Sequence, residues 1–459
     1  MLRHLDKKWK MILYACSGLG LNMLNMIIGV HLCNALISDG FDKNVEFWTF
    51  ENRTLVVVSL WMALSWIVKT LDGIIDIPLS SFTDNLRTKW GRRRPAILIG
   101  YIPLLISYVL FLFPIHHDAT VANTLWFASL LGIFYSSYTL TMVTWYATFA
   151  EIVESDKDRV FMSTVKSICD VAYFSLNFAL VPLFVSMKVN IRVVALIFLP
   201  LALTMLVPLF MIKEKSTKNG LTQNDGELCR EKVKLFTALK YTLKNKSFVY
   251  WLCCVAVMNI GLQLFLGGIS IFFSSVGEGL DMTLVMASSF VPVPFTLLLY
   301  NKIVKRRGTG FAFRYILLVY SVGMSLMMLC HVVSDGMKMP VAIGCAIIVS
   351  FAIGAFFSIT YTVPSQLAAD TNKELGAEIT STMYFAVHGL AEAISAALAT
   401  QVILVFVRTF ASTETSAGPL MTMFPIIVAA FCMTAFVMAF FLPKSISLIG
   451  KERKDGKES

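Results

Sequence analysis

Residues 69–95 read KTLDGIIDIPLSSFTDNLRTKWGRRRP and join an apolar segment to a short basic turn. The apolar segment begins near Leu55 and carries three charged residues, Lys69, Asp72 and Asp76. Their spacings of three and four residues place them on one face of a helix. A carboxylate at membrane depth costs about 2.5–3.5 kcal/mol on insertion scales. Two carboxylates beside one lysine therefore indicate a functional site or a buried ion pair.

The second half of this stretch, residues 84–95, is basic and contains Gly91 and Pro95. Glycine and proline mark turns, and clusters of lysine and arginine mark the cytoplasmic loops of membrane proteins. The pattern therefore predicts a tight cytoplasmic turn between two membrane-spanning helices.

The composition is that of a protein that crosses a bilayer several times. Of the 459 residues, 57% are hydrophobic and 15% are charged. An all-α integral membrane protein with twelve transmembrane helices is predicted, because twelve apolar segments are long enough to span: 11–37, 55–82, 96–114, 122–150, 161–187, 192–212, 248–275, 282–300, 312–333, 340–368, 379–408 and 420–442.

The longest loop, between the sixth and seventh spans, divides the chain into two halves. Residues 1–212 and 248–442 are each predicted to form a six-helix bundle, and 443–459 to form a cytoplasmic tail. Within residues 213–247, Val233, Phe236, Leu239 and Leu243 recur at helical spacing among lysines. This pattern predicts a short amphipathic helix at the cytoplasmic membrane surface.

The distribution of basic residues predicts the topology. Most of the 39 lysines and arginines lie in the N-terminus, the even-to-odd loops and the C-terminal tail. By the positive-inside rule both termini are cytoplasmic. The net charge of +10 therefore reflects topology, and no nucleic-acid partner is expected.

The sequence carries no pattern that favours catalysis. The nine cysteines follow no metal or disulfide spacing. Gly-x-Ser-x-Gly, His-Glu-x-x-His and P-loop patterns do not occur. We therefore expect no enzyme activity, no cofactor, and no metal other than a coupling Na⁺.

Two motifs resemble those of a known transporter family. Asp72-x-x-x-Asp76, then Asp84, Arg87 and Trp90-Gly91-Arg92-x-Arg94-Pro95, resembles the signature of the glycoside–pentoside–hexuronide:cation symporters, the melibiose permease-like family. Tyr146-Ala147-x-x-Ala150-Glu151-Ile152, with Asp158, Arg159 and Lys166, resembles the segment that joins helices four and five in that family. A looser resemblance is Ala369-Asp370-Thr371.

The resemblance implies a fold and an activity. The fold is that of the major facilitator superfamily, with two six-helix bundles and a substrate site between them near the midplane. The activity is alternating-access symport of a small-molecule solute with a coupling cation across the lipid bilayer. A monomer in the plasma membrane is implied.

The resemblance places the cation site at Asp72 and Asp76 and adds Thr139. Because Lys69 alone cannot neutralise two carboxylates, the other acid is expected to take up a proton or to bind a cation. Carboxylate and hydroxyl oxygens suit Na⁺. The family pattern has an asparagine where this chain has Ile75, and this departure favours H⁺ while leaving Na⁺ open. A structural salt bridge is the alternative.

The resemblance also implies a solute site on the first and fourth helices. Asn22 and Met142 stand where the family has two aspartates that bind sugar hydroxyls, so charge-assisted hydrogen bonds are lost. Asn25 is a further hydrogen-bonding candidate, and Trp145 and Tyr146 stand where the family stacks aromatics on a sugar. Helix–helix hydrogen bonds and interfacial anchoring are the alternatives. The expected solute is a sugar, glycoside or related compound.

Charged residues elsewhere in the spans form two further groups. His388 and Glu392 lie four apart on span eleven, where the family commonly has a lysine at the first position. We expect this pair to bind substrate or to relay protons, with packing as the alternative. Gating or structural ion pairs are predicted for Asp84, Arg87, Arg92, Arg94, Glu151, Asp158, Arg159, Lys166 and Asp170.

Two other functions stay open. An uncoupled facilitator or exporter of a less polar solute would fit Met142 and Ile75. A transport-inactive receptor would have little reason to keep four residues together: Lys69, Asp72, Asp76 and Thr139. Ion-dependent uptake distinguishes these functions from symport.

Overall fold

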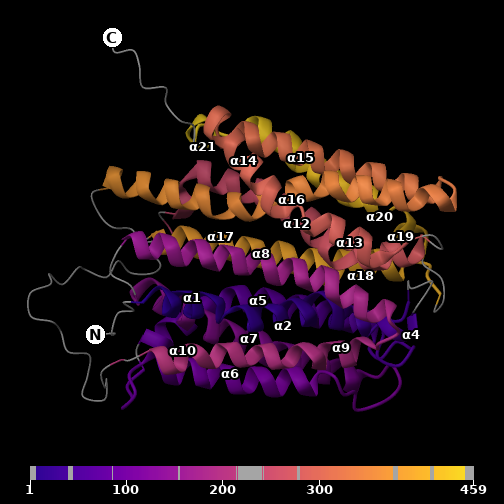
Figure 1. Cartoon of the computed structure of the whole chain (residues 1–459), viewed down its shortest axis with the longest axis horizontal. Helices are drawn as coiled ribbons and strands as arrows, with labels where there is room; N and C mark the ends of the chain where they lie inside the picture. Colours follow the sequence, from indigo (N-terminus) through magenta and orange to yellow (C-terminus); the bar gives the residue numbers. More distant parts are fainter. Residues whose placement is uncertain are drawn as a thin grey trace, which may run out of the picture. The chain divides into compact units, whose positions relative to one another are not determined.

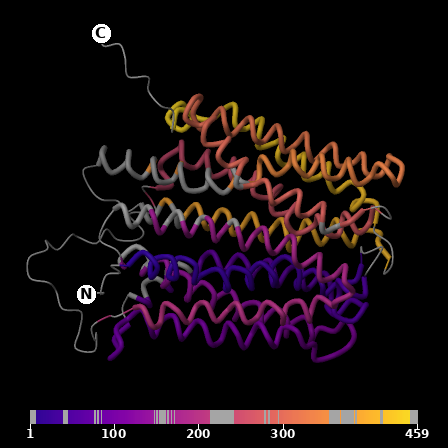
Figure 2. The backbone as a smooth tube through the Cα atoms, viewed as in Figure 1, coloured from indigo at the N-terminus to yellow at the C-terminus, as the bar shows by residue number. Residues whose placement is uncertain are grey.

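The computed structural model describes residues 7–39, 45–84, 86–152, 156–212, 214, 240, 242–276, 280–375, 381–413 and 418–449, and Figure 2 traces the backbone. Within these residues the chain is almost entirely helical, and an isolated β-bridge joins Val56 to Thr120. The chain divides into two compact units, Met1–Cys229 and Arg230–Ser459, which we call the first and second units.

The first unit contains the helices of the N-terminal half (Figure 1). A π-helical segment at Ile27–Leu32 continues its first span, and a 3₁₀ segment at Leu199–Met205 lies within its sixth. Its helices are α1 (Lys8–Cys16), α2 (Leu19–Met26), α3 (Cys33–Ala35), α4 (Val45–Trp48), α5 (Val58–Asp84), α6 (Arg93–Leu110), α7 (Val121–Glu151), α8 (Asp156–Ser186), α9 (Ile191–Phe198) and α10 (Leu206–Met211).

The second unit has a similar set of helices. It includes a π-helical segment at Leu398–Ile403 and 3₁₀ segments at Met327–His331 and Ala439–Phe441. Its helices are α12 (Lys246–Ser275), α13 (Met282–Phe290), α14 (Val293–Arg307), α15 (Thr309–Leu326), α16 (Asp335–Leu375), α17 (Ser381–Ala397), α18 (Leu404–Thr409), α19 (Pro419–Thr422), α20 (Phe424–Met438) and α21 (Lys444–Ser447).

The predicted number of spans is confirmed within the described residues. Twelve helical segments are long and apolar enough to cross a membrane: Lys8–Ala35, Val58–Ile75, Arg93–Leu110, Val121–Tyr146, Ile168–Ser186, Ile191–Met211, Lys246–Ser275, Leu284–Arg307, Thr309–His331, Asp335–Ile353, Val387–Thr409 and Phe424–Phe441. Each overlaps a segment predicted from hydropathy. The amphipathic helix predicted within 213–247 falls largely outside the described residues, and the cytoplasmic position of the termini stays a prediction.

Polar side chains begin several of these helices. Thr120 accepts a hydrogen bond from the backbone N–H of Asn123 at the start of α7. The Asn190 side chain accepts a hydrogen bond from the backbone N–H of Arg192 at the start of α9. The Asn245 side chain accepts one from the backbone N–H of Phe248 at the start of α12. Such caps satisfy backbone donors that have no partner within the helix.

Small residues bring the helices of the first unit close together. Helix α7 packs against α5 and α6. Gly100 of α6 has no room for a side chain, because a Cβ there would collide with Thr141 and with the backbone of Ser137 on α7. Close approach at glycine is a common way to pack helices in membranes. The result is a fixed position for α7, the helix that carries most of the candidate site.

Candidate functional site

One face of α7 gathers the polar and aromatic side chains of the candidate site. Tyr135, Thr139, Met142 and Tyr146 recur at spacings of three and four residues, with Tyr138 beside them. This spacing keeps side chains on one helix face. The face contacts residues of the first, second and fifth spans.

The predicted cation residues meet at the middle of this face. Thr139 Oγ1 donates a hydrogen bond of 2.8 Å to Asp72 Oδ1. Lys69 Nζ lies 3.6 Å from Asp72 Oδ2 and 3.7 Å from the centroid of the Tyr135 ring. Both Asp72 oxygens are thus engaged, one by a hydroxyl and one by an ammonium. Sequence reasoning missed Tyr135, although its spacing from Thr139 was visible.

Five of the predicted site residues have side chains that the structure does not describe. The side chains of Asp76, Asp84, Glu151, Asp158 and Arg159 lie outside the part of the chain that the structure describes. The predicted role of Asp76 beside Asp72 therefore stays a prediction.

The two asparagines of α2 have different surroundings. The hydroxyl of half-buried Tyr138 donates a 2.6 Å hydrogen bond to Asn22 Oδ1, which joins α2 to α7. Asn25 Oδ1 is buried and has no hydrogen-bond partner among the described residues. Tyr138 also lies within electrostatic range of Asp72 and Asp170. Asn22 is thus connected through Tyr138 to the helix face that carries Thr139.

Met142 and Trp145 pack against the first span. The indole of Trp145 is 1% exposed, stacks on Tyr14 with ring centroids 5.7 Å apart, and donates a 2.9 Å hydrogen bond to Ser17 Oγ. A Cβ at Gly18 would contact both Met142 and Trp145. These contacts give the two side chains a packing role at the α1–α7 contact.

Tyr146 differs from its neighbour because 43% of its surface is exposed. Lys166 Nζ lies 5.3 Å from the centroid of its ring. Lys166 also pairs with Asp170 on α8, as their spacing suggested. Tyr146 is therefore far more accessible than Trp145.

In the second unit, α12 and α17 carry a separate polar cluster. His388 is 2% exposed, its Nδ1 lies 3.8 Å from Glu392 Oε2, and its buried Nε2 has no hydrogen-bond partner among the described residues. Asn259 donates hydrogen bonds to the Glu392 carbonyl at 2.9 Å and to Ser395 Oγ at 2.8 Å. Sequence reasoning missed Asn259, which is buried in an otherwise apolar helix.

The basic turn between α5 and α6 is held by Glu214. Its Oε2 accepts hydrogen bonds from the backbone N–H groups of Arg92 and Arg93 at 2.7 and 3.0 Å, and its Oε1 lies 3.5 Å from Arg92 Nε. A carboxylate at a helix N-terminus is favoured by the free N–H groups and the helix dipole. Arg87 is exposed, and the buried Nε of Arg94 has no hydrogen-bond partner among the described residues.

The comparison with known families decides the identity. A model described as MFS/sugar transport protein matches residues 13–445, where MFS denotes the major facilitator superfamily. The chain belongs to this family. No curated protein matches it.

Solved structures support the same fold for this MFS transporter. The nucleoside transporter NupG has 11% identity over 95% of this chain and 99% of its own, with a TM-score of 0.63. A bacterial homologue of the human lysosomal transporter Spinster, in an inward-facing and unoccupied conformation, has 12% identity over 96% and 98%, with a TM-score of 0.63. A POT family transporter in complex with 5-aminolevulinic acid has 10% identity over 95% and 94%, with a TM-score of 0.63. At these identities the likeness concerns the fold.

These findings establish the general activity. The chain is a multi-pass membrane protein that transports a small solute, and it is a transporter and not an enzyme. The family match does not distinguish between subfamilies, so the melibiose permease-like subfamily suggested by the sequence motifs stays a prediction.

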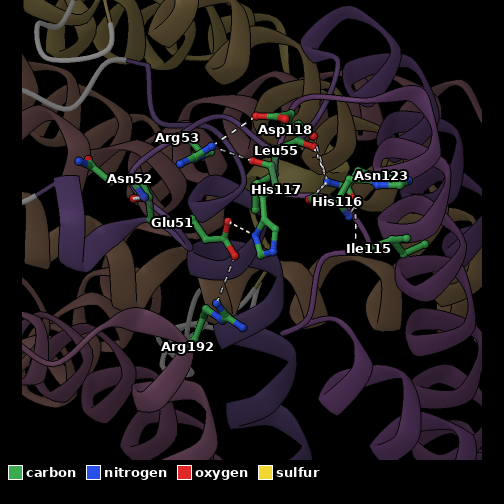
Figure 3. A network of polar contacts seen from close by, with 11 residues as sticks. Glu51, Asn52, Arg53, Leu55, Ile115, His116, His117, Asp118, Asn123 and Arg192 are labelled. Atoms are coloured by element: carbon green, nitrogen blue, oxygen red, sulfur yellow. Dashed lines mark hydrogen bonds and ion pairs between the residues drawn. The ribbon is translucent and has the colours of Figure 1, made fainter.

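A polar network holds the connections of the first unit together at the loops before α5, α7 and α9 (Figure 3). Glu51 lies between His117, at 2.7 Å, and Arg192, at 3.8 Å. Buried Asn123 accepts hydrogen bonds from two backbone N–H groups and donates to three carbonyls of the same loops. Sequence reasoning missed this network, because it joins residues from three separate loops.

Proposed function

We propose that this MFS transporter is a cation-coupled secondary symporter, with H⁺ or Na⁺ as the coupling cation, that works by alternating access. The observation that carries the proposal is the arrangement around Asp72. An intramembrane carboxylate, a hydroxyl donor and an ammonium meet within one apolar region, where an uncompensated charge is costly. Protonation of Asp72, or binding of a cation to it, therefore changes the free energy of the protein strongly. Coupling requires such a change.

The proposed solute is small, polar and uncharged: a sugar, a glycoside or a related hydroxyl-rich compound. Asn22, Asn25 and Tyr138 offer neutral hydrogen-bonding groups on the first and fourth spans. A buried amide oxygen without a partner favours a ligand that donates a hydrogen bond. Tyr146 offers an exposed ring on which a sugar face can stack. His388 and Glu392 are proposed to contribute polar contacts from the second unit.

The proposal also includes the subfamily of the transporter. The motifs around Asp72 and Tyr146 resemble the melibiose permease-like symporters, and we propose membership of that group. A monomer in the plasma membrane with both termini in the cytoplasm is part of the same proposal. NupG is described as a nucleoside transporter, so nucleosides join the solutes to be tested.

One observation favours a second candidate function. Lys69 already lies close enough to Asp72 to neutralise it. If this pair persists throughout transport, the carrier works as an uncoupled facilitator or exporter of a less polar solute. The two candidates differ in whether a gradient drives accumulation.

Uptake into proteoliposomes tests the proposal. A panel of sugars, glycosides and nucleosides is assayed with a Na⁺ gradient alone, a proton gradient alone and no gradient, for the wild type and Asp72→Asn. We expect one gradient to drive accumulation above equilibrium in the wild type, and Asp72→Asn only to equilibrate the solute. Equal accumulation by both proteins would show that coupling does not depend on Asp72 and would contradict the role proposed for it. Equilibration alone by the wild type would support the facilitator instead.

A further inference from the structure

The position of the Lys69 ammonium is the observation from which we infer a property of the cation site. It lies between the Asp72 carboxylate, at 3.6 Å, and the face of Tyr135, at 3.7 Å from the ring centroid. A carboxylate and an aromatic face both attract a cation. Lys69 therefore lies where a carboxylate and an aromatic face both attract positive charge.

The surroundings keep this position fixed. Tyr135 is 2% exposed, and a Cβ at Gly29 would come within 3.0 Å of its hydroxyl, so the ring packs tightly against the first span. Thr139 holds the other Asp72 oxygen by its hydrogen bond. Among the described side chains, the groups that face the ammonium are a carboxylate, a ring and, within electrostatic range, the thiol of Cys33.

A mobile cation would have to compete with this lysine. The pair of Asp72 and Lys69 is already neutral, so a Na⁺ ion that bound to Asp72 would lie beside the like charge of the Lys69 ammonium, which is unfavourable in an apolar span. Na⁺ also needs several oxygen ligands, and both Asp72 oxygens already have partners, the Thr139 hydroxyl that donates to Oδ1 and the Lys69 ammonium near Oδ2. Removal of the ammonium would leave a carboxylate and a hydroxyl without a positive partner.

We propose that Lys69 is a tethered cation that fills the cation site formed by Asp72, Thr139 and Tyr135. The site therefore rejects Na⁺, and the proton is the coupling cation. This inference rests on the proposed symport. It assigns Lys69 the role of a specificity-determining residue for the coupling ion, in place of a structural salt bridge.

The chain contains a matched control for this lysine. Lys166 is also an intramembrane lysine that pairs with an aspartate on its own helix, Asp170, and approaches a tyrosine ring, that of Tyr146. Its ring distance is longer, 5.3 Å, and no threonine hydroxyl is recorded as a donor to Asp170 among the described residues. Replacing Lys166 removes the same side chain and charge as replacing Lys69, but it leaves the ammonium of Lys69 beside Asp72.

The experiment measures thermal unfolding of the purified full-length protein in detergent, as NaCl replaces choline chloride at constant ionic strength. We expect no Na⁺-specific shift of Tm for the wild type or Lys166→Ala. We expect a saturable, Na⁺-specific rise of several degrees for Lys69→Ala and for Lys69→Met, since a ligand that binds only the folded state stabilises it. Lys69→Met keeps most of the side-chain volume and carries the test if Lys69→Ala does not fold.

A double variant shows where the ion binds. The Na⁺-specific rise should disappear when Asp72→Asn is added to either Lys69 variant. A Na⁺-specific rise in the wild type would overturn the inference, and so would its absence from every Lys69 variant that folds. Because the readout is binding, it stands apart from transport. If the Lys69 variants bind Na⁺ but the protein never accumulates solute, the proposed symport is wrong. The assignment of Lys69 as the tethered cation would still hold.

Discussion

Replacing Asn123 by alanine should destabilise the first unit strongly, although the residue lies far from the cation site along α7. Asn123 is fully buried. Its Oδ1 accepts from the N–H groups of Ile115 and His116, each at 3.0 Å. Its Nδ2 has two hydrogens and three carbonyl acceptors within 3.2 Å, those of Leu55, His116 and Asp118 (Figure 3). Four hydrogen bonds can therefore form at once.

The expected size follows from these bonds. A net contribution of about 1 kcal/mol for each hydrogen bond gives about 4 kcal/mol as an upper value. Water that enters after truncation recovers part of this loss, so we expect about 2–4 kcal/mol. For a unit of roughly 200 residues, 1 kcal/mol corresponds to about 2–4 °C in Tm. Asn123→Ala should therefore lower Tm by roughly 5–15 °C.

Arg53→Ala is the matched comparison in the same network. Arg53 Nη1 lies 3.3 Å from Asp118 Oδ1, but the two side chains are 53% and 83% exposed. Exposed ion pairs contribute about 0–1 kcal/mol, so the change in Tm should stay within about 3 °C. Tryptophan fluorescence during heating in detergent measures both variants. Equal shifts for the two variants would refute the reasoning that buried hydrogen bonds, and not exposed ion pairs, hold these loops.

Three further predictions concern packing, the cation site and the basic turn. Gly20→Ala should lower Tm, because its new methyl group collides with the backbone carbonyl of Leu201, and overpacking costs about 1–3 kcal/mol. Thr139→Val should remove the hydrogen bond to the Asp72 carboxylate, which contributes about 1.5–3 kcal/mol to the free energy of unfolding. Glu214→Ala should cost about 0.5–2 kcal/mol, measured as thermal stability, because two N–H groups at the start of α6 lose their acceptor.

Each of these variants has a control. Gly344→Ala should leave Tm nearly unchanged, because a Cβ there meets nothing within 4 Å. Thr144→Val removes a hydrogen bond to the Leu140 carbonyl one turn away on the same helix. Glu214→Gln keeps an oxygen acceptor. A control that matches its test variant in thermal stability would show that the contact in question contributes nothing.

Hydropathy was sufficient to predict the twelve spans, because about twenty consecutive apolar residues have few other uses. Spacing within one helix was also informative. The pairs Lys69–Asp72 and Lys166–Asp170 lie three and four residues apart, and the structure brings each pair together. Both predictions depend on the geometry of a single helix, which the sequence fully determines.

Contacts between helices could not be predicted in this way. Asn22 and Tyr138 are 116 residues apart, and Arg92 and Glu214 are 122 apart. Their pairing depends on how helices pack, and this packing depends on shape complementarity along whole faces. Sequence reasoning also treated Trp145 and its neighbour alike, although successive residues on a helix point in different directions.

The most direct test of coupling is a measurement of proton movement caused by the solute. Proteoliposomes with an internal pH-sensitive dye receive an inward gradient of the transported solute, without any imposed ion gradient. The account predicts that the vesicle interior becomes more acidic with the wild type, in proportion to solute entry, and does not change with Asp72→Asn. Solute entry without any acidification in the wild type would contradict proton symport.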